Sequence, residues 1–270
     1  MSLAWDSERV ARWLRQSEGI ERQLAPVSAL LLSAASLQPG ERVLDVGCGT
    51  GPTTRDAADA VGPDGRVTGL DISVDMVEAA RSVSPDWVDW IVADAVTWDA
   101  PEGEWDVVIS RFGVMFFSEP AAAFGALARA TVDGGRLAIV TWAHGSVQPV
   151  FQVPLQAALT VVDAEPPPPE AGPFSLHDPD AIAALLHGAG WSDASTVAHD
   201  LDLVLAGGLD PARAAVTSVD FGPTRIVLEG ADDDTRQAAV DAVATALADH
   251  VDTDGRVVLG GRVLVTTARR

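Results

Sequence analysis

The sequence predicts an α/β fold, in which a mostly parallel sheet carries helices on both faces, an antiparallel strand pair lies at one edge, and added helices lie over the ligand end of the sheet. Three observations support this prediction. Short apolar runs alternate with helical patterns between residues 40 and 145, these runs are apolar nearly throughout, and two long alternating stretches follow near the C-terminus. Apolar strands separated by helices are typical of a parallel sheet buried on both faces, and alternating stretches are typical of antiparallel strands.

The individual elements follow from the same patterns. We expect two helices in residues 5–36, a helix starting at Pro52, a helix capped by Ser73, a helix capped by Asp178, and a helix near residues 235–249. Short polar side chains favour helix starts because they accept hydrogen bonds from the free N–H groups there. The expected parallel strands are 42–46, 67–70, one ending near Asp94, 107–110 and 136–142, and residues 196–205 and 257–267 are expected to pair antiparallel.

Composition excludes several classes of function. Acidic residues number 39 against 18 basic ones, all of them Arg, which gives a net charge of −21. Such a charge repels a polyphosphate backbone, so we expect no nucleic-acid partner. No apolar run approaches the roughly 18 residues of a membrane span, so we expect no membrane association. The single cysteine, Cys48, excludes an internal disulfide and favours a cytoplasmic location, and no cluster of His and carboxylates indicates a metal site.

A glycine-rich stretch, "VLDVGCGTG" at residues 43–51, follows the first expected strand. A dinucleotide-binding motif needs a third glycine where this chain has Pro52 or Thr54, and a phosphate-binding P-loop needs a Gly-Lys-Ser/Thr that is absent. The spacing G-x-G-x-G, preceded by Asp45, suits a ligand that lays a ribose and a short amino-acid tail along the backbone. Because ligands bind at the carboxyl ends of parallel strands, we expect this loop, Asp71, Asp94 and the residues after Ser110 to converge.

In these motifs the chain resembles the class I S-adenosylmethionine-dependent methyltransferases. The resemblance covers residues 40–145 and rests on "VLDVGCGTG", "VTGLDIS", "VADA", "WDVVISRFGVMFF" and "ATVDGGRLAIVTW", in that order. The segments "SRFGVMFFSEPAAAF" and "GPFSLHDPDAIAALL" are similar to the type-11 subgroup, near the quinone-biosynthesis C-methyltransferases and natural-product methyltransferases. The resemblance implies the Rossmann-like class I methyltransferase fold, with S-adenosylmethionine as the cofactor and S-adenosylhomocysteine as its product.

The resemblance also implies roles for single residues. Asp71 would accept both ribose hydroxyls, as an acidic residue at this place does in dinucleotide folds. The adenine would meet Ile72, the Asp94 carboxylate and the backbone N–H of Ala95. The methionine tail would lie along Gly47, Gly49 and Gly51 with Arg111 as the floor, while Asp45 would act indirectly or support the loop.

The methyl acceptor would lie beyond this cofactor site. The residues that we expect to line it are Phe112, Met115, Phe116 and His177, although Met115 and Phe116 also suit the core. His144 follows the fifth strand and is a candidate general base, because an imidazole can exchange a proton near neutral pH. Trp5 and Trp13 suit either a lid over the cofactor or plain packing.

These inferences predict one domain and one preferred function. Residues 1–38 would form N-terminal helices and a lid, 40–145 the cofactor-binding core, 146–180 a substrate-side segment, and 181–270 C-terminal helices and edge strands. The function would be methyl transfer, by SN2 displacement, to an O, N or C nucleophile of a small molecule in secondary metabolism or quinone-like biosynthesis. Alternatives are a cyclase or sensor that uses the cofactor without methyl transfer and, with less support, an NAD(P)-dependent oxidoreductase. The chain would act as a monomer or homodimer.

Overall fold

The structure is a computed structural model that describes residues 7–270, so the suggested role of Trp5 lies outside the described residues. The strands are β1 (Arg42–Val46), β2 (Arg66–Asp71), β3 (Asp89–Val92), β4 (Trp105–Arg111), β5 (Thr131–Trp142), β6 (Ser192–Val204) and β7 (Val258–Arg269). The α-helices are α1 (Ser7–Ala35), α2 (Pro52–Val61), α3 (Val74–Ser82), α4 (Pro120–Ala130), α5 (Pro149–Ala158), α6 (Pro179–Gly188), α7 (Pro211–Ser218), α8 (Gly222–Val227) and α9 (Asp233–Leu247). Short 3-10 turns lie between them: η1 (Gly113–Phe116), η2 (Gly145–Val147), η3 (Gly172–Phe174), η4 (Leu205–Gly207) and η5 (Ala248–His250).

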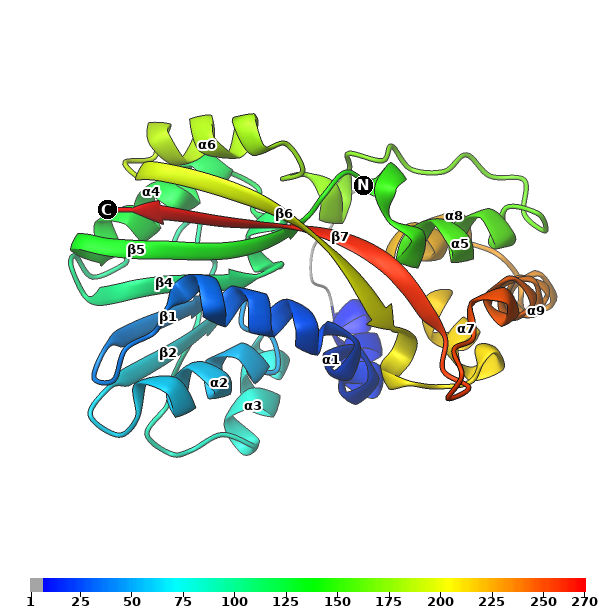
Figure 1. Ribbon diagram of the computed structural model, residues 1–270, viewed down its shortest axis with the longest axis horizontal. Helices are drawn as coiled ribbons and strands as arrows, with labels where there is room; N and C mark the ends of the chain where they lie inside the picture. Colours follow the sequence, from blue (N-terminus) through cyan, green and yellow to red (C-terminus); the bar gives the residue numbers. More distant parts are fainter. Residues whose placement is uncertain (1–6) are drawn as a thin grey trace.

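The strands form one sheet in the order β3-β2-β1-β4-β5-β7-β6 (Figure 1). The pairs β3–β2, β2–β1, β1–β4 and β4–β5 are parallel, whereas β7 runs antiparallel to both β5 and β6. This arrangement confirms the predicted fold class. The chain leaves β1 toward β2 and returns to β4 on the other side, so the order reverses between β1 and β4, where an open α/β sheet has its ligand crevice.

Helices cover both faces of the sheet, as the unbroken apolar character of the parallel strands predicts. Helices α1, α2 and α3 contact strands of the parallel part on one face, while α4 and α6 pack together against β5 and β6 on the other. Each face has its own apolar core. Val107 and Ile109 of β4 face the first core, and the intervening Val108 faces the second with Phe124, so the side chains of this strand alternate between the two cores.

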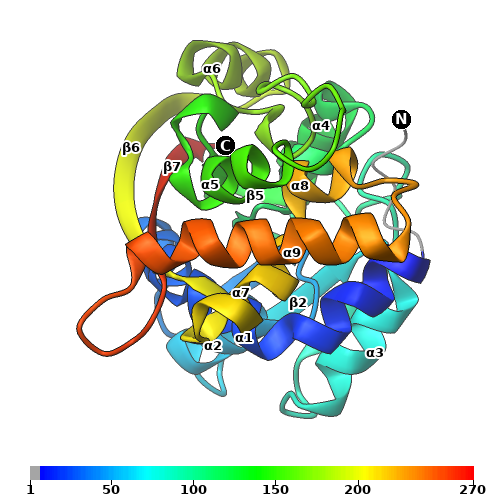
Figure 2. The same cartoon turned by 90° about the vertical axis from the view of Figure 1, so that its right-hand side faces the viewer.

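A second lobe of helices lies beside the sheet. Helices α5, α7, α8 and α9 pack against one another next to the far ends of the long strands β6 and β7 (Figures 1 and 2). The expected C-terminal helices are thus gathered near the carboxyl ends of the parallel strands. Within residues 7–270, no helix combines the length and the apolar character that a membrane crossing requires.

The first helix corrects one prediction. Residues 7–35 form the single helix α1 rather than two helices, with Pro26 in its interior. Proline removes one backbone hydrogen bond from a helix, but packing on both sides compensates here. Ile20 and Leu24 before the proline, and Val27 and Leu31 after it, are buried on one continuous helical face.

The two halves of α1 pack on different lobes. After Pro26 the helix lies on the sheet. Before it, Trp13 meets the ring of Phe221 edge-on at 5.8 Å, and Gln16 donates a hydrogen bond of 2.8 Å to Asp220. The N-terminal segment therefore bridges the sheet and the helical lobe.

Other boundaries differ by a few residues. Strand β3 ends at Val92 rather than near Asp94, because the Asp94 carbonyl accepts hydrogen bonds from the N–H groups of Thr97 and Trp98 and turns the chain. Strands β6 and β7 are longer than expected, since they pair with each other from Ser192–Arg269 to Val204–Val258. Ser73 and Asp178 cap α3 and α6 as predicted.

Candidate active site

The glycine loop joins β1 to α2 at the switch point of the sheet. Gly47 has φ +66°, and a Cβ atom there would lie 2.6 Å from the Cα atom of Gly113. Both the left-handed backbone and the close approach of a second backbone require glycine at this position. The N–H of Gly47 donates to the Leu70 carbonyl at 2.8 Å, so this turn links β1 to the ends of β2 and β4.

The two other loop glycines differ in what lies above them. A Cβ atom at Gly51 would lie 2.6 Å from the indole of Trp90, whereas a Cβ atom at Gly49 would meet nothing within 4 Å among the described residues. Gly47 and Gly51 are thus required by internal packing. Gly49 is the loop glycine with open space beside it, which is where a ligand can approach the backbone.

Asp45, in β1 directly before the loop, is completely buried. One carboxylate oxygen accepts hydrogen bonds from the hydroxyls of Thr53 (2.6 Å) and Thr54 (2.7 Å), at the start of α2. Burial raises the pKa of Asp45 to about 6, although the two threonine hydrogen bonds and the charge of Arg111 act in the opposite direction. The second oxygen has no partner among the described residues. Asp45 therefore anchors α2 to the loop, in keeping with its predicted supporting role.

Asp71 ends β2 and faces the same loop. Its carboxylate accepts hydrogen bonds from the N–H of Gly49 at 2.9 Å and from the N–H of Ser73 at 2.9 Å. Burial raises the pKa of Asp71, and these backbone bonds lower it in part. A carboxylate offers about four acceptor positions, so Asp71 keeps acceptor capacity for a ligand hydroxyl. Ile72, the next residue, is 53% exposed, so its apolar side chain is accessible to a ligand beside Asp71.

Asp94 and Ala95 follow β3, whose last residue, Val92, lies beside Asp71 in the sheet. The Asp94 carboxylate accepts a hydrogen bond from the N–H of Val96 at 2.9 Å, which orients it within a short turn. The Ala95 side chain is buried in the core. The structure therefore brings Asp94 to the same edge of the sheet as Asp71, as predicted.

Arg111 ends β4 and points toward α1. Its side chain is only 7% exposed, forms an ion pair with Glu21 and donates a hydrogen bond to the Ser28 hydroxyl at 2.8 Å. A cleft of about 250 Å³ lies here between α1 and α2, with Arg111, Glu21 and Asp56 among its lining residues. The sequence indicated Arg111 but not its two partners, which are more than 80 residues away in the chain.

A series of aromatic rings continues from the end of β4 into the helical lobe. Phe112, with φ +66°, stacks on Trp142 of β5 with a centroid separation of 4.5 Å and an interplanar angle of 9°. Trp142 contacts Phe151 of α5 at 5.2 Å, and Phe151 contacts Phe174 at 5.4 Å. A non-glycine residue in the left-handed region is strained, and such strain is often found at functional sites.

Two of the predicted acceptor-lining residues lie on η1. Met115 is buried, and its sulfur accepts a hydrogen bond of 3.4 Å from the N–H of Trp142. Phe116 is partly buried under the guanidinium of Arg9, 4.9 Å from the ring centroid. Met115 thus belongs to the wall behind the aromatic series, while the ring of Phe116 faces Arg9 of α1.

The two histidines singled out from the sequence lie against each other. The rings of His144 and His177 meet edge to face, with centroids 4.9 Å apart and an interplanar angle of 73°. His144 follows β5, and His177 precedes α6, whose cap is Asp178. This contact could not be expected from the sequence, because the two residues are more than 30 positions apart in the chain. Each residue had nevertheless been expected near the same end of the sheet.

Besides Glu21 and Ser28, sequence reasoning missed three residues of the site: Trp90, Gly113 and Trp142. Gly113 had a visible signal, because it lies two residues after the end of β4. The contacts of Trp90 and Trp142 depend on sheet register and had no local signal.

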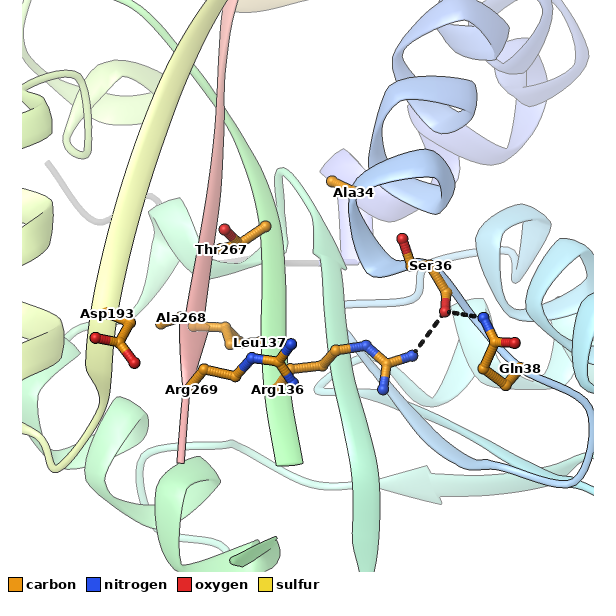
Figure 3. Close-up of a pocket in the computed structure, with 9 residues that line it drawn as sticks. All are labelled: Ala34, Ser36, Gln38, Arg136, Leu137, Asp193, Thr267, Ala268 and Arg269. Carbon is orange, nitrogen blue, oxygen red and sulfur yellow. Dashed lines mark hydrogen bonds between the residues drawn. The ribbon is translucent and has the colours of Figure 1, made fainter. Parts of the chain in front are cut away.

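Another cavity lies at the opposite end of the sheet. It has a volume of about 410 Å³ and is lined by the starts of β5 and β6, the end of β7 and the end of α1 (Figure 3). Arg136 in this cavity is bound by the Glu41 carboxylate and by the Ser36 carbonyl, which also accepts from Gln38. Because parallel-sheet ligands bind at the carboxyl ends of the strands, this cavity is separate from the candidate active site.

The residues present fit S-adenosylmethionine. Asp71 has free acceptor positions for ribose hydroxyls, Gly49 has open space beside its backbone, and Ile72 presents apolar surface. The second Asp45 oxygen is buried without a partner among residues 7–270. Over the same residues, no group of three His, Cys, Asp or Glu side chains is arranged to hold a metal ion. Burial raises the pKa of the Cys48 thiol, so it suits packing rather than nucleophilic attack.

Comparison with known proteins identifies the family. Residues 43–135 match the family described as "Methyltransferase domain". The chain is 32% identical to a demethylmenaquinone methyltransferase of Renibacterium salmoninarum, over 62% of this chain and 73% of that protein. It is 30% identical to a nocamycin O-methyltransferase of Saccharothrix syringae, over 66% of this chain and 69% of that protein.

A solved structure shares the fold. Phosphoethanolamine N-methyltransferase 2 of Haemonchus contortus, in complex with S-adenosyl-L-methionine, aligns with a TM-score of 0.52 and 18% identity. The alignment covers 90% of this chain and 51% of that chain, and at this identity it shows the fold alone. The two relatives are at least 30% identical to this chain over more than two thirds of their own length, and the glycine loop lies at the switch point of the sheet. The chain therefore belongs to the class I S-adenosylmethionine-dependent methyltransferases, with S-adenosylmethionine as its cofactor.

Proposed function

We propose that this enzyme transfers the methyl group of S-adenosylmethionine to a hydroxylated aromatic small molecule of quinone or natural-product biosynthesis. The observation that carries this proposal is the series Phe112, Trp142, Phe151 and Phe174, which leads from the end of β4 into the helical lobe. Phe112 and Phe151 are partly exposed, while Trp142 and Phe174 are buried behind them. Planar rings bind favourably against such partly exposed aromatic side chains, and apolar lining is usual for small-molecule sites. The name of one relative, a demethylmenaquinone methyltransferase, supports a quinone-like acceptor, and the name of another, a nocamycin O-methyltransferase, supports O-methylation of a natural product.

Within this proposal, Asp71 accepts the ribose hydroxyls with the acceptor positions that Gly49 and Ser73 leave free. Ile72 covers one face of the adenine. Asp94 accepts a hydrogen bond from the adenine amino group, and the backbone N–H of Ala95 donates one to a ring nitrogen. The amino-acid tail runs along the glycine loop toward Arg111. Arg111 pairs with Glu21 of α1, so binding in this region also fixes the helix that bridges the two lobes.

The chemical demand on the protein is small. The bound cofactor supplies a methyl group on a positively charged sulfur, which is already an excellent leaving group. The protein has to align the acceptor with this methyl group and exclude water. Removal of the hydroxyl proton activates the acceptor oxygen or the neighbouring ring carbon, and the imidazoles of His144 and His177 are the candidates for that proton transfer.

Product analysis tests the proposal. The enzyme is incubated with S-adenosylmethionine carrying a CD3 group and with a panel of hydroxylated naphthalenes and anthraquinones, including 1,4-dihydroxynaphthalene under reducing conditions. Mass spectrometry should show a product that has gained one labelled methyl group, and Asp71→Ala should form much less of it. Glu78→Ala, on the exposed side of α3, serves as the matched control and should behave as wild type.

The other outcomes separate the alternatives. Calorimetric binding of S-adenosylmethionine without a labelled product from any member of the panel would contradict the proposed acceptor class. Conversion of an acceptor to an unlabelled isomer would instead indicate a cyclase that uses the cofactor without methyl transfer. Absence of cofactor binding in a folded sample would contradict the assigned cofactor site.

A further inference from the structure

We propose that His177, rather than His144, is the general base that removes the proton from the acceptor hydroxyl, and that His144 presents a fixed hydrogen-bond donor beside it. The inference rests on the proposed function, because it requires an acceptor that must lose a proton. It follows from what each imidazole binds through Nδ1.

His177 is oriented by a backbone carbonyl. Its Nδ1 lies 2.7 Å from the carbonyl oxygen of Phe174. A carbonyl oxygen can only accept, so Nδ1 carries the hydrogen and the neutral ring has its lone pair on Nε2. When Nε2 takes up a proton, the Nδ1–H bond to Phe174 is kept and becomes charge-assisted, hence stronger. His177 can therefore accept a proton without losing a contact.

His144 is held in the opposite way. Its Nδ1 accepts a hydrogen bond from the N–H of Ser146 at 3.3 Å and lies 2.7 Å from the Ser146 hydroxyl. A backbone N–H can only donate, so Nδ1 of the neutral ring is unprotonated and Nε2 carries the hydrogen. Protonation of His144 at Nδ1 would break the bond from the Ser146 N–H that caps η2, and the Ser146 hydroxyl would have to turn from donor to acceptor. His144 is thus a donor through Nε2 and, unlike His177, loses a contact when it takes up a proton.

The contact between the rings adds a second constraint. With ring centroids 4.9 Å apart, a charge on one imidazole opposes a charge on the other. The charged residues near the pair are Glu170, Asp178 and Asp180, which are exposed, and Arg262 of β7, whose carbonyl accepts from the N–H of Ala143 and whose guanidinium is paired with Asp200. The Phe174 carbonyl, which orients Nδ1–H of His177, makes His177 the ring that is set to take up the proton.

The reaction then balances as follows. The acceptor O–H bond breaks and its proton forms a bond to Nε2 of His177, while the acceptor oxygen or its conjugated ring carbon forms the new bond to the methyl carbon. The sulfur–methyl bond breaks, and its electron pair stays on sulfur to give S-adenosylhomocysteine. His177 afterwards releases the proton to water, which restores the neutral ring.

The tautomers can be measured without any acceptor. In protein labelled with 15N-histidine, long-range 1H–15N spectra at pH 8 should show His177 protonated at Nδ1 and His144 protonated at Nε2. His177→Gln and His144→Gln assign the two signals. The reverse tautomers, or a rapid mixture at His177, would overturn the proposal.

Kinetics test the role in the reaction, with the acceptor that the labelled-product screen identifies. His177→Gln keeps an N–H that can reach the Phe174 carbonyl but cannot take up a proton. It should lower kcat by about 100-fold or more with little change in KM, since general bases contribute on the order of 10²–10⁴-fold. His144→Gln should cost less than about tenfold, and His187→Gln, exposed on α6, should match wild type.

The pH profile distinguishes a base from a structural residue. Wild type should lose activity on the acid side, and His177→Gln should lack this acid limb. Its deficit should also shrink above the pH at which the acceptor hydroxyl ionises without help. Equal losses in both variants, or an unchanged acid limb in His177→Gln, would overturn the assignment. An inactive wild type with every acceptor would instead contradict the proposed function, and this inference with it.

Discussion

The buried carboxylate of Asp45 predicts a specific dependence of stability on pH. Its pKa is raised from 3.8 to about 6 by complete burial. The folded chain therefore holds this proton more tightly than the unfolded chain, and the free energy of unfolding falls as the pH rises through about 4 to 6. A difference of this size corresponds to about 3 kcal/mol in total, of which about 1.4 kcal/mol is lost between pH 5 and pH 8.

Replacement of Asp45 by Asn isolates this contribution. The Asn carbonyl can still accept from the Thr53 and Thr54 hydroxyls, but the side chain cannot ionise. Denaturant unfolding, followed by tryptophan fluorescence, should show wild type losing about 1.4 kcal/mol more than Asp45→Asn between pH 5 and pH 8. Burial also raises the pKa of Asp71, but that residue is present in both proteins and its effect cancels in the comparison.

Two further variants sharpen the test. Asp59→Asn, on the exposed side of α2, changes the same net charge and should keep the wild-type pH dependence. Thr54→Val removes a hydrogen bond that lowers the pKa of Asp45, so it should extend the pH-dependent loss to higher pH. Parallel stability curves for wild type and Asp45→Asn would refute the reasoning, because Asp45 would then ionise without cost in the folded chain.

Three other predictions concern the loop and the strand ends. Asp71→Ala should weaken S-adenosylmethionine binding by about tenfold or more in calorimetry, since hydrogen bonds to a charged group contribute roughly 1.5–3 kcal/mol; unchanged affinity would remove Asp71 from the site. Gly47→Ala should destabilise the fold more than Gly49→Ala. Both positions have positive φ, which costs an alanine about 1–2 kcal/mol, but only at Gly47 would the Cβ atom lie 2.6 Å from another backbone atom. Equal unfolding midpoints for the two variants would contradict this explanation. Arg111→Met should cost about 3–5 kcal/mol, because it leaves Glu21 largely buried without its cation, and Glu21→Gln in the same background should recover part of that loss.

The parts of the fold that follow from local pattern were predictable. Strand β1 covers residues 42–46 as expected, and the polar caps Ser73 and Asp178 mark α3 and α6 correctly. The continuity of α1 was not predictable, because a proline normally interrupts a helix and only tertiary packing on both sides of Pro26 overrides that preference.

The site divides in the same way. Asp45, Asp71 and Asp94 are brought to one edge of the sheet because strand ends of a parallel sheet meet there, which topology alone dictates. The contact between His144 and His177 depends on the path of the chain between β5 and α6, which includes η3, and no periodicity in the sequence predicts that path. Roles that depend on such contacts become visible only when the chain is folded.

The long pairing of β6 with β7 has a consequence for how the acceptor gains entry. After an irregularity between Ser192 and Ser195, the ladder keeps one register from the Ser195–Thr267 pair in the sheet to the Val204–Val258 pair at the helical lobe (Figure 1). Its amides should therefore exchange with deuterium as one slow cooperative unit that spans both lobes. Helices α7 and α8 lie outside this ladder and should exchange faster. A rotation of one lobe away from the other would have to distort this ladder, so we expect a bulky substrate to enter by local movement of the helices rather than by separation of the lobes.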